Sequence, residues 1–65
     1  MNYWIKSRYN PQLGTFFTKM GQMTKKDAKE CEKSLYGSNV MLSFKTVEEY
    51  EEKIKELTKA GNRIQ

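Results

Sequence analysis

The sequence predicts a small α+β fold in the order strand, strand, helix, strand, helix, with an optional short C-terminal strand. Three observations predict it: two alternating segments joined by a turn, a third alternating segment, and two helical stretches that each follow a threonine. At 65 residues the chain forms a single domain, residues 1–65. Because the sheet and each helix would have one apolar face, we expect a two-layer sandwich with both helices on one face of a three- or four-stranded sheet.

The first two strands are predicted at residues 3–9 and 15–20, where aromatic and β-branched residues alternate with polar ones. The segment 10–14 separates them. Pro11 lacks an N–H group and Gly14 tolerates positive φ, so no strand can continue through it. The simplest arrangement is a hairpin that ends where Gly21 breaks the pattern.

The first helix is expected to begin after Thr24, whose hydroxyl can cap the first turn. Ala28, Cys31 and Leu35 then recur at helical spacing and form one apolar stripe. Gly37 is a suitable left-handed C-cap. A right-handed crossover through this helix would place the third strand parallel to the second, with the first strand between them.

The third strand is predicted at residues 40–44, and Thr46 with Glu49 then forms a capping box. The second helix should end near Gly61, and residues 62–65 could add a short edge strand. Its apolar stripe consists of Val47, Tyr50, Ile54 and Leu57.

The positive charge is concentrated in the first two thirds of the chain. Residues 1–45 hold eight basic side chains against three acidic ones, whereas residues 46–65 hold four against five. A period of two predicts that one sheet face is apolar and that the other, left uncovered, carries cations and exposed aromatic rings, which usually mark a contact. This predicted partner-binding face consists of Trp4, Lys6, Arg8, Phe17, Lys19 and Lys45, with Met41 and Ser43 among them.

Three interpretations of that face remain open. Trp4, Arg8 and Phe17 could anchor an acidic protein surface, with the lysines steering its approach, and the protein would be a small regulator or inhibitor. The same rings and cations could bind single-stranded DNA or RNA. Alternatively, Trp4 and Phe17 form a small hydrophobic cluster that lysine stems cover. A homodimer through the face would satisfy the same aromatic residues.

No catalytic, metal-binding or cofactor-binding site is predicted. Cys31 has no histidine to activate it and is expected to be a small core residue. The glutamates of the second helix lie on its polar side, where a solvated surface is the ordinary role: Glu48, Glu49, Glu51, Glu52 and Glu56. A single cysteine, no apolar leader and no membrane span predict a cytoplasmic, non-catalytic binding module that does not enter a membrane.

Three stretches of the chain are similar in style to short accessory proteins of tailed bacteriophages. These stretches are Asn10-Pro11-Gln12-Leu13-Gly14, Gly21-Gln22-Met23-Thr24 and Leu35-Tyr36-Gly37. The resemblance covers the whole chain and implies a phage-encoded protein that binds one host factor. It carries no diagnostic motif and assigns no functional residue.

Overall fold

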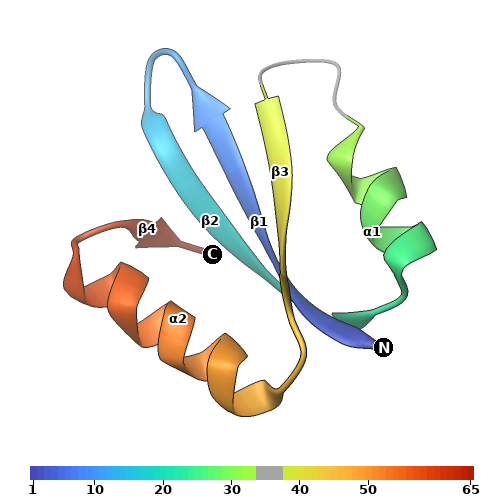
Figure 1. Cartoon of the computed structure of the whole chain (residues 1–65). Helices are drawn as coiled ribbons and strands as arrows, with labels where there is room; N and C mark the ends of the chain where they lie inside the picture. Colours follow the sequence, from blue (N-terminus) through green and yellow to red (C-terminus); the bar gives the residue numbers. More distant parts are fainter. Residues whose placement is uncertain (34–37) are drawn as a thin grey trace.

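The computed structural model describes residues 1–33 and 38–65, and it contains a four-stranded mixed sheet and two helices. Strands β1 (Asn2–Asn10) and β2 (Gly14–Met23) form the hairpin, and α1 (Lys25–Glu32) leads to β3 (Ser38–Phe44). Helix α2 (Val47–Lys59) then leads to the two-residue β4 (Arg63–Ile64). The predicted α+β class and element order are confirmed, including the C-terminal strand (Figure 1). The expected roles of Leu35 and Gly37 lie outside the described residues.

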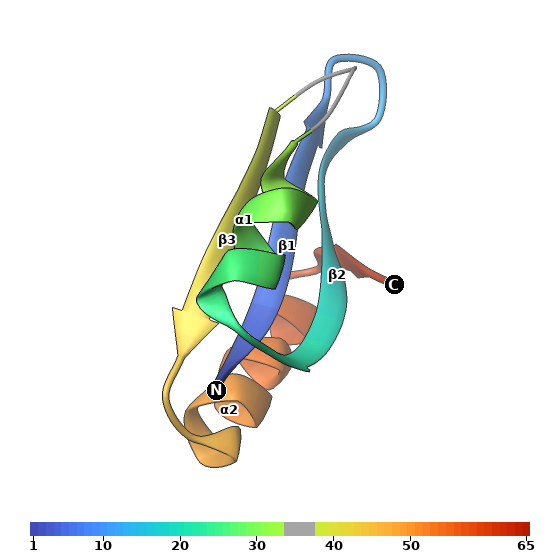
Figure 2. The same cartoon turned by 90° about the vertical axis from the view of Figure 1, so that its right-hand side faces the viewer.

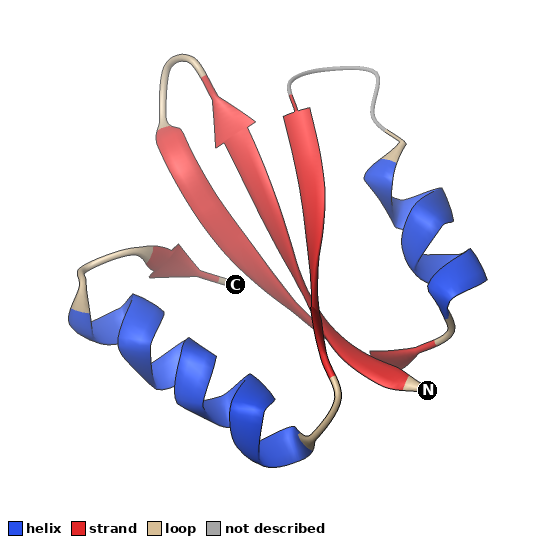
Figure 3. Ribbon diagram, in the orientation of Figure 1, coloured by secondary structure: helices blue, strands red, loops and turns tan. Residues whose placement is uncertain are grey.

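The strand order is β3-β1-β2-β4, so β1 lies between two neighbours and β3 lies at one end of the sheet. Strand β1 is antiparallel to both β2 and β3, and β4 is parallel to β2. Strand β3 therefore runs parallel to β2 with β1 between them, as the crossover rule predicts. Figure 3 shows the two helices separated by the strands.

The two helices pack on opposite faces of the sheet, so the expectation of two helices on one face of a two-layer sandwich is wrong. Trp4 and Ile5 are neighbours on β1 and point to opposite faces. Trp4 packs with Ala28 of α1, whereas Ile5 packs with Tyr50 of α2. Figure 2 shows α1 in front of the sheet and α2 behind it.

The handedness of the connections explains this arrangement. The chain crosses β1 in one direction through α1, from β2 to β3, and returns in the other direction through α2, from β3 to β4. Right-handed crossovers that run in opposite directions along a sheet place their helices on opposite faces. Because β4 lies beside β2, a right-handed connection from β3 to β4 places α2 on the face of the sheet opposite α1.

Each helix begins at the expected threonine. The Thr24 hydroxyl accepts a hydrogen bond from the Asp27 N–H, and the Thr46 hydroxyl accepts one from the Glu49 N–H, each at 3.2 Å. Such a cap stabilises a helix by about 1 kcal/mol because it satisfies an otherwise unpaired N–H group. Gly61 follows Ala60, the C-cap of α2, and has φ of +84°, as expected for the glycine that ends this helix.

The predicted end of β2 at Gly21 is wrong, because the strand continues to Met23 beyond a β-bulge. The pairing of β1 with β2 shifts between Ile5 opposite Lys19 and Trp4 opposite Gly21. Gly21 has φ of +73°, and its N–H donates to the Tyr50 hydroxyl at 3.2 Å. The glycine thus permits the irregular backbone, and α2 satisfies the N–H group there.

Trp4 lies beneath α1 and is 7% exposed. It packs with Ala28 and Met41, and its indole N–H donates to the Met23 carbonyl at 2.9 Å. Met41 was expected on an open face, but α1 covers it too. The indole therefore joins β1, β3, α1 and the end of β2.

We expect Trp4→Ala to lower the free energy of unfolding by about 3–5 kcal/mol, because it removes a large buried side chain and leaves a cavity. Urea unfolding followed by far-UV circular dichroism measures this loss. Leu13→Ala is the control, since Leu13 is 68% exposed and its change should stay within about 0.5 kcal/mol. A loss below about 1 kcal/mol for Trp4→Ala would contradict the burial of the indole under α1.

Candidate functional site: a cationic row on the sheet

The six positions predicted to form one binding face do not lie together. Trp4 belongs to the core beneath α1 and offers no exposed ring. Lys45 follows β3 at the Asn2 end of the sheet, whereas Arg8 lies near the hairpin end. Trp4, Lys6 and Arg8 share one face as expected, but α1 covers Trp4, and only Lys6 and Arg8 remain partly accessible there.

Phe17 and Lys19 lie on the α2 side, so their predicted placement beside Trp4 is wrong. In the hairpin, Ser7 pairs with Phe17 and Ile5 pairs with Lys19. Paired residues share a face, and Ile5 faces α2. The whole middle of β2 is therefore inverted relative to the expectation, because a register change of one residue exchanges the two faces.

The structure instead brings two arginines to either side of one phenylalanine. On the α1 side of the sheet, Arg8 of β1 pairs with Phe16 of β2, and Phe16 pairs with Arg63 of β4. The Arg8 guanidinium carbon lies 5.9 Å from the centre of the Phe16 ring, within cation–π range. We call Arg8, Phe16 and Arg63, with Lys6 on the same face, the cationic row.

Sequence reasoning found Lys6 and Arg8 but missed Phe16 and Arg63. Phe16 was assigned to the apolar face because β2 was read in the wrong register. Arg63 lies in a strand of two residues, which has no periodicity to recognise. The length of the hairpin turn is the signal that could have placed Phe16. Because Asn10 pairs with Gly14, counting back along both strands places Phe16 opposite Arg8.

The cationic row has no carboxylate partner within the described residues. The ion pairs found there, Lys33–Glu30 and Lys53–Glu56, are both within or next to a helix, and of their four residues only Lys53 is half-buried. The strand residues paired with Lys6 and Arg8 include three neutral ones on this face: Asn39, Met41 and Thr18. Lys6 and Arg8 are half-buried, whereas Arg63 is exposed.

The charges of the whole molecule follow the same division. The α1 side, made of the cationic row and residues 25–33, carries seven cations against three carboxylates. Helix α2 on the opposite side carries three lysines against five glutamates. Six of the eight basic side chains of residues 1–45 therefore belong to the α1 side, whereas Lys19 lies on the α2 side.

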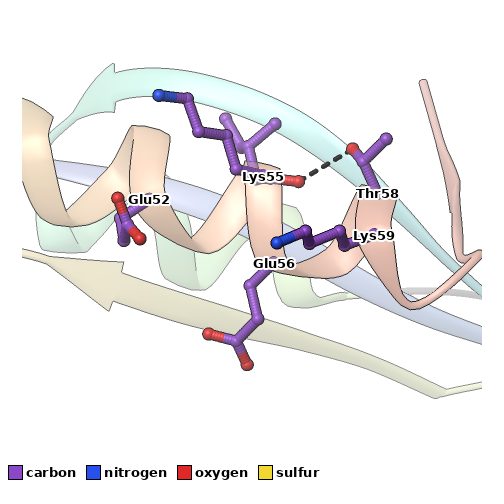
Figure 4. Close-up of a pocket in the computed structure, with 6 residues that line it drawn as sticks. Glu52, Lys55, Glu56, Thr58 and Lys59 are labelled. Carbon is purple, nitrogen blue, oxygen red and sulfur yellow. Dashed lines mark hydrogen bonds between the residues drawn. The ribbon is translucent and has the colours of Figure 1, made fainter.

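The surface also has hollows away from the cationic row. One lies along α2 alone, where the Thr58 hydroxyl donates to the Ile54 carbonyl at 2.8 Å and charged side chains surround it (Figure 4). Another lies between β2 and α2, at Lys19, Tyr50 and Lys55. Across the described parts of the chain, no group of three or more histidine, cysteine or acidic side chains is placed to hold a metal ion.

Cys31 is half-buried and packs against the Trp4 cluster, in agreement with its expected role as a small core residue. Neither described helix is long and apolar enough to cross a bilayer. Comparisons with protein-family models, curated proteins and solved structures find no match to this chain.

Substitution of the two phenylalanines tests the assignment of faces. Phe17 packs in the Ile5 cluster, whereas Phe16 lies outside both core clusters. We expect Phe17→Ala to lower the free energy of unfolding by about 2–4 kcal/mol and Phe16→Ala by about 1 kcal/mol, since less packed surface is lost at Phe16. Urea unfolding of the two variants gives the comparison. An equal or larger loss for Phe16→Ala would show that the register is misassigned.

Proposed function

We propose that this protein is a non-catalytic binding module that docks on an acidic protein surface through the cationic row. The observation that carries the proposal is that Arg8 and Arg63 flank Phe16 and that neither forms an ion pair with a carboxylate in the described parts of the chain. Arginine forms bidentate hydrogen bonds with carboxylates and, with aromatic residues, is enriched at the anchor points of interfaces.

The distribution of charge supports this choice of surface. The seven cations of the α1 side would attract an acidic partner, while the glutamates of α2 would repel it from the opposite side. Lys6, Arg8 and Arg63 would then contact the partner, and the α1 lysines would raise the rate of association.

An acidic protein fits the row better than a single-stranded nucleic acid does. Binding of single strands relies on several aromatic platforms for successive bases. The row offers one ring, Phe16, because Trp4 is buried and Phe17 faces α2. A module of this kind would act in the cytoplasm as a small regulator or inhibitor of its partner, and the likeness to phage accessory proteins suggests a host protein in that role.

Removal of the two arginines tests the proposal. The double variant Arg8→Ala/Arg63→Ala is compared with wild type as bait in a host-cell extract, and the bound proteins are quantified by mass spectrometry. We expect an acidic protein retained by the wild type to fall at least about tenfold, because loss of an interface anchor costs roughly 2 kcal/mol or more.

The matched control is Lys55→Ala/Lys59→Ala, which removes the same charge from exposed positions on the opposite side. It should retain the partner as the wild type does, and circular dichroism confirms that each variant is folded. Equal retention by the arginine variant would contradict the proposal. Binding of a labelled 20-nucleotide oligothymidine in about 50 mM salt, weakening log-linearly as salt rises, would assign the row to nucleic acid instead.

A further inference from the structure

Strand β3 has an open outer edge with unusual composition. It lies at the end of the sheet, and no strand of the described chain lies beside its outer edge (Figure 2). Its seven residues, SNVMLSF, include no charged residue and no proline, although 31% of the whole chain is charged. Natural edge strands usually carry charges, prolines or bulges that prevent pairing with another strand. Strand β3 is therefore an edge that is able to accept one.

A protruding side chain and a hollow lie on the same face of this edge. Val40, Leu42 and Phe44 alternate along β3 and face the α2 side. Val40 is 53% exposed because α2 leaves the hairpin end of the sheet bare. At the other end of β3, Phe44 lines a hollow with Glu49, Glu52, Lys53 and Glu56 of α2. The side chain and the hollow are each two residues from Leu42.

We propose that a second copy of this chain pairs with β3 in antiparallel register, with Leu42 at the twofold axis. The symmetry places Val40 of each copy beside Phe44 of the other, at the mouth of its hollow. A twofold interface requires such mutual contacts, in which residue i meets residue j and residue j meets residue i. A β-branched residue opposite an aromatic residue is also a favourable cross-strand pair.

The opposite face of β3 also tolerates this register. Met41 would lie opposite Ser43 of the second copy, and Asn39 opposite Lys45, so no like charges meet. The axis is perpendicular to the sheet, so both cationic rows would lie on one side of a continuous eight-stranded sheet. This pairing does not depend on what the cationic row binds.

The interface is short, so the dimer is weak and depends on concentration. A single seven-residue edge provides less area than the roughly 1,200–2,000 Å² of a standard stable interface. We therefore expect a dissociation constant in the micromolar range, up to about 1 mM. Sedimentation equilibrium from about 10 µM to about 1 mM should show the mass rising from the 7.7 kDa of one chain toward twice that value.

Substitutions of Val40 with opposite charges test the register. Val40→Glu would place a carboxylate beside Glu49, Glu52 and Glu56 of the other copy and should raise the dissociation constant at least about tenfold. Val40→Lys would meet the same glutamates with an opposite charge, so its dissociation constant should be at least about threefold below that of Val40→Glu. The difference between the two should shrink in high salt.

Leu13→Glu is the matched control, since Leu13 is also an exposed apolar residue, at 68% against 53% for Val40, and lies at the hairpin tip away from β3. It should leave the dissociation constant within about twofold of wild type. Should Val40→Glu fail to fold, Val40→Thr keeps the shape, introduces a hydroxyl and should still weaken the dimer.

Four outcomes would overturn the proposal. They are a wild type that stays monomeric at about 1 mM, a Val40→Glu variant as dimeric as wild type, an effect of Leu13→Glu as large as that of Val40→Glu, and equal dissociation constants for Val40→Glu and Val40→Lys.

Discussion

The burial of both faces of β1 is the constraint on which this fold depends. Trp4 and Ile5 are adjacent in sequence, point to opposite faces and are only 7% and 0% exposed. A strand of this kind needs a cover on each side, and residues 1–33 and 38–65 contain only two helices to provide it. Helix α1 covers Trp4 and α2 covers Ile5, so the described residues form two small cores rather than one.

The bulge in β2 connects these two cores. It lies opposite Trp4 and Ile5, and Met20 within it and Met23 beyond it pack against the Trp4 cluster. The Gly21 N–H group at the bulge donates to the hydroxyl of Tyr50, whose ring packs with Ile5 on the other face. A residue of the α2 core thus holds the backbone that closes the α1 core, which couples the two helices through the sheet.

Local sequence signals predicted the helices and strands, but no local signal determines how distant strands and helices are placed against one another. Thr24, Thr46 and Gly61 act at the helix ends through neighbouring backbone groups, so the sequence reveals them directly. The side of the sheet that α2 covers depends on where β4 pairs. Strand β4 has only two residues, so its sequence shows no alternation that would reveal this pairing. The face of Phe17 depends on one residue of hairpin register, which alternation within β2 alone cannot determine. Lys6 and Arg8 were found because β1 is regular, and Arg63 was missed because only the fold brings it beside Phe16.

The limited coverage of the sheet by the two helices also determines which surfaces are accessible to a binding partner. The two helices cover the part of the sheet around Trp4 and Ile5, and the hairpin end extends beyond them (Figure 1). On the α1 side this bare region carries the cationic row, and on the α2 side it carries Tyr9 and Val40, each about half exposed. One face is suited to an anionic partner and the other, at the β3 edge, to apolar strand pairing. Because these surfaces lie on different sides of the sheet, the proposed partner and a second copy of the chain could be bound at the same time.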